Sequence, residues 1–220
     1  MEQKQVIIIG ASGHGKVVLD TLERMGNYEV LGFVDDRVDK PVLEQPILGK
    51  VSELSNILNS HPQTEVFIAI GDNWTRKKIR EEIQGSNPLI QWASAIHPAS
   101  HIGRGVQLGT GIAVFAGAVI NSGSDMGDFT IVGSHTCVDH DNVLAPFASL
   151  APGCHLGGNV SLGECTTVGI GGNLKHGIKI GAHTVIGAGS TVLQDFGDHQ
   201  VAYGTPAKVI RKRTPGESYL

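Results

Sequence analysis

An aliphatic residue recurs at every sixth position from Ile96 to Val192. A period of six matches neither the 3.6-residue repeat of an amphipathic helix nor the two-residue alternation of an ordinary strand. It is typical of a parallel β-helix, in which each coil has three faces of six residues and uses about eighteen residues. We therefore expect stacked coils with these side chains turned inward. The aliphatic positions are Ile96, Ile102, Leu108, Val114, Ile120, Met126, Val132, Val138, Leu144, Leu150, Leu156, Leu162, Val168, Leu174, Ile180, Ile186 and Val192.

Glycine often follows the aliphatic residue directly, as at Gly103, Gly133 and Gly163. We expect these glycines at tight corners, which need small residues or unusual backbone angles. Small or branched residues such as Thr130 and Ala148 stand four positions after the aliphatic residue. They are expected to fill a second inward layer, which leaves no open lumen.

The six-residue rhythm is absent before Ile96, where apolar runs such as QVIII and EVFIAI alternate with helical segments such as KVVLDTLERM and TRKKIREEI. This alternation predicts a βαβαβα half-Rossmann domain with a parallel sheet. We expect this α/β domain over residues 1–92 and the β-helix, with a C-terminal tail, over 93–220.

Polar and glycine residues follow three of the predicted strands, at 10–15 (GASGHG), 35–36 (DD) and 71–73 (GDN). Ligands bind where such strand ends converge, and glycines let the backbone approach a phosphate at a helix N-terminus. Asp35 lies twenty residues after Gly15, a spacing typical of a carboxylate that binds ribose hydroxyls. The alternative is that the glycines only form a turn, the aspartates cap a loop, and Arg76 is a solvated helix charge.

The segment from Gly10 to Lys16 also reads GxxxxGK, but Val17 occupies the position where a P-loop needs a hydroxyl for magnesium. The spacing differs from GxGxxG as well, which disfavours a dinucleotide. A mononucleotide or nucleotide-sugar is the better expectation.

The chain carries 17 basic and 21 acidic residues, which argues against nucleic acid as a partner. Its apolar runs, such as Val6 to Ile9, are too short for membrane insertion or a signal peptide, so we expect a cytoplasmic protein. Cys137, Cys154 and Cys165 lack CxxC spacing. They are expected to be reduced structural thiols, with no metal bound.

Several motifs together resemble the PglD/PerB/NeuD-like family of bacterial sugar O- and N-acetyltransferases: IIIGASGHGKVV, FVDD, AIGDNWTRKKI, VDHDNVL, VGIGGNL, IGAGSTVLQD and YGTPAKVI. The resemblance covers nearly the whole chain. It implies a left-handed parallel β-helix, acetyl-CoA as co-substrate, and a homotrimer with active sites between subunits. It also implies a nucleotide-linked amino sugar as acceptor.

By this resemblance, His140 is the base that takes a proton from the acceptor amine, and Asp141 orients the imidazole ring. The cofactor positions are Gly158, Ile170, Ala188 and Ser149, met mainly through backbone amides. Ser149 and Ala188 replace a His and a Gly of the relatives. The expected substrate-binding residues are Gly10, Ser12, Gly13, His14, Asp35, Asp36, Gly71, Asn73 and Arg76.

The leading hypothesis is N-acetylation of the 4-amino group of a nucleotide-linked 4-amino-4,6-dideoxy sugar, either UDP-linked of the bacillosamine-precursor type or GDP-perosamine. A sialic-acid-type O-acetyltransferase is the alternative. A γ-carbonic-anhydrase-like enzyme would need three histidine ligands for zinc, which ten histidines permit. A non-catalytic nucleotide-sugar-binding scaffold would have lost the His-Asp pair, which is intact.

Overall fold

The computed structural model describes residues 3–219, which form two units. The first unit comprises the chain up to Gly71 together with Thr75–Pro98, and the second comprises Asp72–Trp74 together with the chain from Ala99 onward. The first unit extends past residue 92, where we expected it to end. Its last segment runs beside strand β4 (Glu65–Ile68), because the Ala93 N–H donates to the Val66 carbonyl at 2.9 Å.

The first unit is built on a four-stranded parallel sheet in the order β3-β2-β1-β4. This confirms the half-Rossmann prediction, with one short strand, β3, that was not expected. In β1, Val6 to Ile9 are at most 1% exposed, as a central strand covered on both faces requires. The elements are β1 (Lys4–Ile9), α1 (Gly13–Met25), β2 (Tyr28–Val34), β3 (Ile47–Gly49), the 3₁₀ helix Val51–Glu53, α2 (Leu54–Ser60), β4, α3 (Asn73–Ser86) and β5 (Ala95–Ile96).

Helix α1 directly follows the glycine turn and buries one apolar stripe, Val18, Leu19 and Leu22. It ends at Gly26, whose φ of 72° is the left-handed conformation that glycine adopts without a steric penalty. Strand β1 pairs with β2 on one side and with β4 on the other. The glycine turn therefore leaves the sheet at the point where strand order reverses, which is the ligand-binding position of open α/β sheets.

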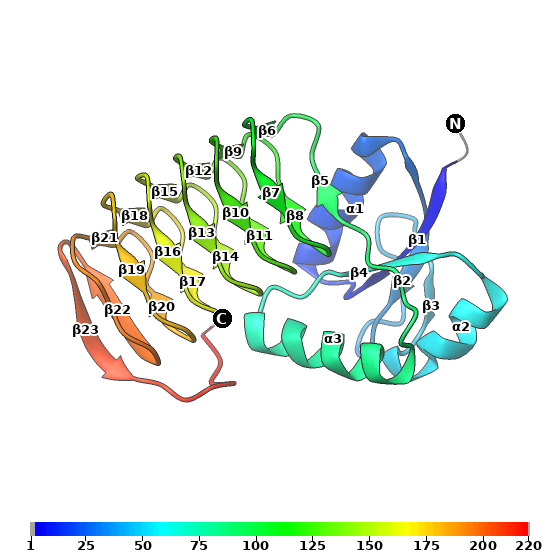
Figure 1. Ribbon diagram of the computed structural model, residues 1–220. Coiled ribbons are helices and arrows are strands. Elements are labelled where there is room, and N and C mark those ends of the chain that lie inside the picture. Colours follow the sequence, from blue (N-terminus) through cyan, green and yellow to red (C-terminus); the bar gives the residue numbers. More distant parts are fainter. Residues whose placement is uncertain (1–2, 220) are drawn as a thin grey trace. The chain divides into compact units, whose positions relative to one another are not determined.

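The second unit is a left-handed parallel β-helix, as expected, and its coils follow one another from β6 (green) to β21 (orange) in Figure 1. Each coil uses eighteen residues, so that Val132 pairs with Leu150 and Leu150 with Val168. The first sheet contains β7 (Gln107–Leu108), β10 (Asp125–Met126), β13 (Val143–Leu144), β16 (Ser161–Leu162) and β19 (Lys179–Ile180). The second contains β6 (His101–Ile102), β9 (Val119–Ile120), β12 (Cys137–Val138), β15 (His155–Leu156), β18 (Asn173–Leu174) and β21 (Thr191–Val192). The third includes β8 (Ala113–Val114), β11 (Ile131–Val132), β14 (Ser149–Leu150), β17 (Thr167–Val168), β20 (Val185–Ile186), β22 (Gln200–Gly204) and β23 (Ala207–Lys212).

The core of the β-helix follows the predicted pattern. Every aliphatic position from Val114 to Val192 is at most 4% exposed, and the second-layer residues of the same coils, including Thr130 and Ala148, are buried as well. At the start of the ladder, Ile96, Ile102 and Leu108 are only half-buried, as are the second-layer residues Ser100 and Val106. No helix within residues 3–219 has both the length and the apolar content to cross a bilayer.

The expected role of the corner glycines was partly wrong. The left-handed residue lies three positions after the aliphatic residue, and it is Gly153 in one coil but His135 or Phe147 in others. Gly133, directly after Val132, has no such angle. A Cβ atom there would lie 2.6 Å from the backbone nitrogen of Pro152 in the next coil. These glycines are needed for close approach between coils rather than for unusual backbone angles.

Candidate active site

His140 and Asp141 form an exposed pair at a corner between β12 and β13. The Nδ1 atom of His140 lies 2.8 Å from Oδ2 of Asp141, and the two side chains are 50% and 59% exposed. A proton on Nδ1 donates to the carboxylate, which leaves the lone pair on Nε2. Asp141 adopts the left-handed conformation, with φ of 56°. The pair thus has the geometry of an oriented general base.

The hydrogen bond that His140 donates to Asp141 raises the pKa of His140 above its ordinary value of 6.5, and the nearby charge of Asp139 acts in the same direction. Both effects stabilise the imidazolium form. A higher pKa makes the ring a stronger proton acceptor once it is neutral.

The turn that carries His140 is held by Asn142, which is fully buried. Its Nδ2 donates to the Asp139 carbonyl at 2.6 Å, and its Oδ1 accepts the Val160 N–H of the next coil at 2.8 Å. Ser124 Oγ, from the preceding coil, also donates to the Asp139 carbonyl. Our reading of the sequence missed Asn142. The signal was an amide at an inward position, where the other coils have Thr, Ala, Val, Ser, Ile, Cys or Gly.

Replacing Asn142 with Ala is expected to lower the free energy of unfolding by about 1–3 kcal/mol, because the buried Val160 N–H loses its acceptor. Chemical denaturation would measure the change. The control is Asn173→Ala on β18, where the side chain is exposed and the loss should stay within about 0.5 kcal/mol. Equal losses in the two variants would show that Asn142 does not brace the turn.

Gly158 lies one coil after His140, directly against its ring. A Cβ atom at Gly158 would be 2.6 Å from both Nε2 and Cε1 of His140. His176, one coil further on, has its ring centroid 6.2 Å from that of His140. The missing side chain of Gly158 therefore leaves room for the two imidazoles. The structure brings together two residues that the sequence assigned to one site, His140 and Gly158.

Ile170 and Ala188 lie on a different corner of the β-helix. The Gly189 N–H donates to the Ile170 carbonyl, whereas the His140 carbonyl accepts from Asn159. Ile170 is 64% exposed. In the described coils, the backbone hydrogen bonds between neighbouring coils use three N–H groups around each aliphatic residue. These belong to the residue before it, the residue after it and the third residue after it. The N–H groups of Gly158, Ile170 and Ala188, two residues after, stand outside this ladder.

Ser149 is not placed with the other expected cofactor residues. It is 8% exposed, and its Oγ lies 3.0 Å from Oγ1 of Thr167 in the adjacent strand. Its hydroxyl is therefore bonded within the sheet.

The first unit contains a pocket of about 400 Å³ at the ends of β1 and β2. Three features of the glycine turn shape it. Gly10 has φ of 102°, and a Cβ at Gly15 would collide with the Gly10 carbonyl oxygen, so both glycines are required by the turn itself. A Cβ at Gly13 would meet nothing within 4 Å, so the space beside the Gly13 backbone is open. The lining residues are Ile9, Gly10, Ser12, Val34, Asp35, Asp36, Arg37, Val38, Val51, Ile70, Thr75 and Ile79.

Asp35 braces this pocket. Its Oδ2 accepts the Ala11 N–H at 2.8 Å, and its Oδ1 accepts the N–H groups of Arg37 and Val38. Partial burial alone would raise the pKa of Asp35, but the three backbone donors outweigh it and lower the pKa. Asp36 accepts the Val51 N–H at 3.0 Å. Asp35 is thus ionised and lines the pocket, and it remains a candidate residue for binding ribose hydroxyls.

His14 and Arg76 lie close enough for their charges to interact. Burial, followed by the charge of Arg76, lowers the pKa of His14 to about 4. His14 is therefore neutral near pH 7. Arg76 is 1% exposed, and its Nη1 donates to the carbonyls of Ile70 and Gly71. It is not the solvated helix charge that was the alternative.

Asn73 does not join these residues in the first unit. Its Nδ2 donates to the Thr166 carbonyl at 3.2 Å and to Thr167 Oγ1 at 2.8 Å, both on the β-helix. The side chain is 1% exposed. The amide is therefore bonded within the β-helix rather than set beside the glycine turn.

Comparison with known proteins places this geometry in a family. The PglD N-terminal domain model matches residues 5–83. A histidine-to-alanine variant of GDP-perosamine N-acetyltransferase from Caulobacter crescentus, solved with CoA and GDP-perosamine, is 36% identical, with a TM-score of 0.89 over 94% of this chain and 97% of that one. The acetyltransferase domain of PglB from Neisseria gonorrhoeae is 33% identical, with a TM-score of 0.89 over 94% of this chain and 100% of that one.

Among curated proteins, galactoside O-acetyltransferase from Lactococcus lactis is 45% identical over 53 residues, which is 24% of this chain and 26% of that protein. This match covers a small part of the relative, whereas the matches to the solved structures cover both chains almost completely. The PglB domain was also solved with acetyl coenzyme A, the acetyl donor of the family. The two-unit fold, the glycine turn and the full-length similarity establish that this chain belongs to the PglD/PerB-like family of sugar acetyltransferases.

Proposed function

We propose that this protein transfers the acetyl group of acetyl-CoA to the 4-amino group of a nucleotide-linked 4-amino-4,6-dideoxy sugar. The observation that carries the proposal is the His140–Asp141 pair with Gly158 against the Nε2 edge of the ring. As the new C–N bond forms, His140 Nε2 accepts the proton that the amine loses. It returns that proton to the departing sulfur as the C–S bond breaks, so the reaction needs no further reactant.

The Gly158 N–H supports this chemistry because it stands outside the coil ladder and next to the proposed base. We assign it as the donor to the thioester carbonyl oxygen, where negative charge develops during attack. The N–H groups of Ile170 and Ala188 also lie outside the coil ladder. They can therefore donate hydrogen bonds to acetyl-CoA, which we expect the protein to bind mainly through backbone amides.

The separation of the two corners leads to a proposed assembly. Because Ile170 and Ala188 lie on a different corner from His140 in one chain, their cofactor contacts would have to come from a neighbouring subunit. A homotrimer with three equivalent active sites between subunits satisfies this requirement, and is part of the proposal.

The glycine-turn pocket is assigned to the nucleotide-sugar. Asp35 and Asp36 line the pocket and offer carboxylates to ribose or base. Gly13, in the adjoining turn, offers a backbone approach to phosphate, and neutral His14 is assigned beside the sugar. GDP-perosamine, which the Caulobacter enzyme binds, is one candidate, and a UDP-linked 4-amino sugar is the other.

Acetyl-CoA-dependent thiol release should be measured with GDP-perosamine, a panel of UDP-4-amino sugars and sialic acid. Turnover with one amino sugar-nucleotide would support N-acetylation and identify the nucleotide. Turnover with sialic acid alone would replace the proposal with O-acetylation.

The pH profile tests the role of Asp141. His140 acts as a base only when neutral, so kcat/KM should rise as pH increases through its raised pKa. In Asp141→Asn the rise of kcat/KM should occur at lower pH, because the carboxylate no longer stabilises the imidazolium. The maximum kcat/KM reached at high pH should also fall. The control is Asp125→Asn, an exposed position on β10 that should leave the rise at the same pH. An unmoved rise in Asp141→Asn would remove the pair from the mechanism.

A further inference from the structure

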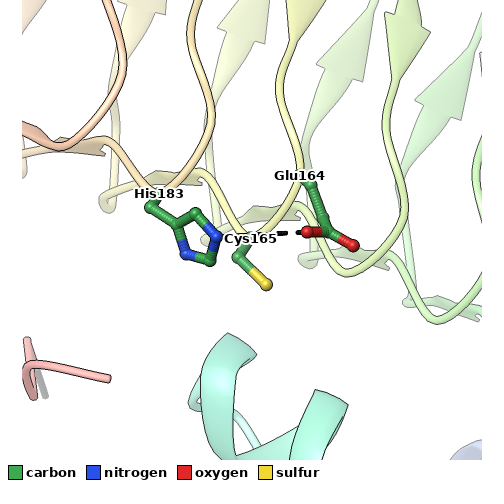
Figure 2. Close-up of side chains that lie close together, drawn as sticks. All are labelled: Glu164, Cys165 and His183. Carbon is green, nitrogen blue, oxygen red and sulfur yellow. Dashed lines mark ion pairs between the residues drawn. The ribbon is translucent and has the colours of Figure 1, made fainter. Parts of the chain in front are cut away.

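A cluster of three potential metal ligands lies on the third corner of the β-helix. Cys165 and His183 are eighteen residues apart, and the backbone ladder stacks their corner, since the His183 N–H donates to the Glu164 carbonyl at 2.8 Å. One ligand atom from each of Glu164, Cys165 and His183 lies within 4.8 Å of the others. Figure 2 shows the three side chains on neighbouring turns of the coil, with His183 and Glu164 joined as an ion pair.

We propose that Glu164, Cys165 and His183 form a binding site for a thiophilic divalent cation of the zinc class. The donor set favours this class, because thiolate sulfur, imidazole nitrogen and carboxylate oxygen are the three ligand types that zinc takes from proteins. Magnesium and calcium, in contrast, prefer oxygen ligands alone. The proposed site contains one histidine, whereas the γ-carbonic-anhydrase hypothesis required three histidine ligands.

The distances require only a small adjustment. Tetrahedral zinc has bonds of about 2.0–2.3 Å, which separate neighbouring ligand atoms by about 3.3–3.8 Å. The His183 Nε2 and Glu164 Oε2 atoms are already 4.0 Å apart. The three ligand atoms lie within 4.8 Å of one another, at most about 1.5 Å beyond that spacing. The Glu164 side chain is 37% exposed and has several rotatable bonds, so it can bring its oxygen closer to the other two ligand atoms.

The backbone and the neighbouring rings fix the other two ligands. Cys165 and His183 both adopt the left-handed conformation, with φ of 56° and 54°. The ring of His183 packs edge-on against Trp74 at 5.5 Å and stacks on His199 at 5.1 Å. Restricted ligands lose less conformational freedom when they bind a metal.

Charge balance also favours the site. Cys165 is 2% exposed, and an isolated charge at such a position would be costly. A divalent cation bound to one thiolate, one carboxylate and one neutral imidazole gives a complex with no net charge. When His183 is neutral before binding, one proton is released, from the Cys165 thiol. From the imidazolium form that pairs with Glu164, the His183 proton is released as well.

The inferred role is structural. The site would link two successive coils, and its three ligands lie on neither the His140 corner nor the Ile170 corner. Three protein ligands leave a fourth position for water. Because this site is separate from the proposed acetyl-transfer site, failure of either proposal leaves the other standing.

Cobalt titration of the tag-free, chelator-treated full-length protein tests the site. Co²⁺ is the probe because a cobalt–thiolate bond gives a near-ultraviolet charge-transfer band that requires a cysteine ligand. We expect one Co²⁺ per chain with this band, loss of the band when Zn²⁺ is added, and a rise in the thermal unfolding midpoint with Zn²⁺.

In Cys165→Ser the band should vanish, whereas Cys154→Ser, which alters a buried thiol outside the cluster, should retain it. His183→Gln should weaken cobalt binding at least about tenfold, and circular dichroism would confirm that each variant keeps its fold. The proposal is overturned if the native protein gives no thiolate band, if the band survives in Cys165→Ser, or if His183→Gln binds Co²⁺ as tightly as the native chain.

Discussion

His140→Ala is expected to lower kcat/KM by about 10² to 10⁴, the usual contribution of a general base. The fold should be unaffected, because the side chain is 50% exposed and makes its side-chain hydrogen bond only to Asp141. Acetyl-CoA-dependent thiol release at several acceptor concentrations would give the value.

The matched control is His155→Ala, which removes another exposed imidazole, on β15 one coil from Cys137. This variant should keep kcat/KM within about threefold of the native value, since its ring lies outside the proposed site. If both variants turned over at the native rate, His140 would have no catalytic role.

Gly158→Ala is expected to lower kcat/KM by about 10² or more, because the new methyl group would occupy space held by the His140 ring. Its Cβ would lie 2.6 Å from Nε2, which forces the ring to move, and a displacement of about 1 Å can cost 10²-fold in rate. The control is Gly197→Ala, whose Cβ meets its first neighbour at 3.4 Å and should change little.

The double variant His140→Ala/Gly158→Ala separates two explanations of that loss. If Gly158→Ala acts by displacing His140, its effect should largely disappear once the imidazole is absent. A full additional loss in the double variant would assign the effect to Gly158 itself. Native activity in Gly158→Ala would contradict the close approach of the two residues.

The sequence could predict the β-helix because a six-residue period fixes both the coil length and the inward side chains. The pairing of Val132 with Leu150 follows from that period alone. The same arithmetic predicts that residues eighteen apart, such as His140 and Gly158, are neighbours. It could not give the corner angles, because the left-handed position accepts His135 and Phe147 as well as glycine.

Other parts of the site depend on contacts that no motif specifies. Asp35 has the ribose-binding spacing, yet its oxygens also brace the Ala11 and Arg37 amides. Asn73 follows a strand-end motif, yet its amide bonds to the β-helix. Cys165 lacks CxxC spacing, because its potential partner His183 stands one coil away rather than nearby in the chain. A search at the coil period would have found that pair.

The most direct test of N-acetylation compares a nucleotide-linked 4-amino sugar with its 4-hydroxy counterpart as acceptors of the acetyl group of acetyl-CoA. Product mass should be determined before and after mild alkali, which cleaves an ester and leaves an amide intact. We expect turnover of the amino sugar and an alkali-stable acetyl group, with far slower turnover of the hydroxy sugar. Equal turnover of both acceptors, or an alkali-labile product from the amino sugar, would contradict N-acetylation of the 4-amino group.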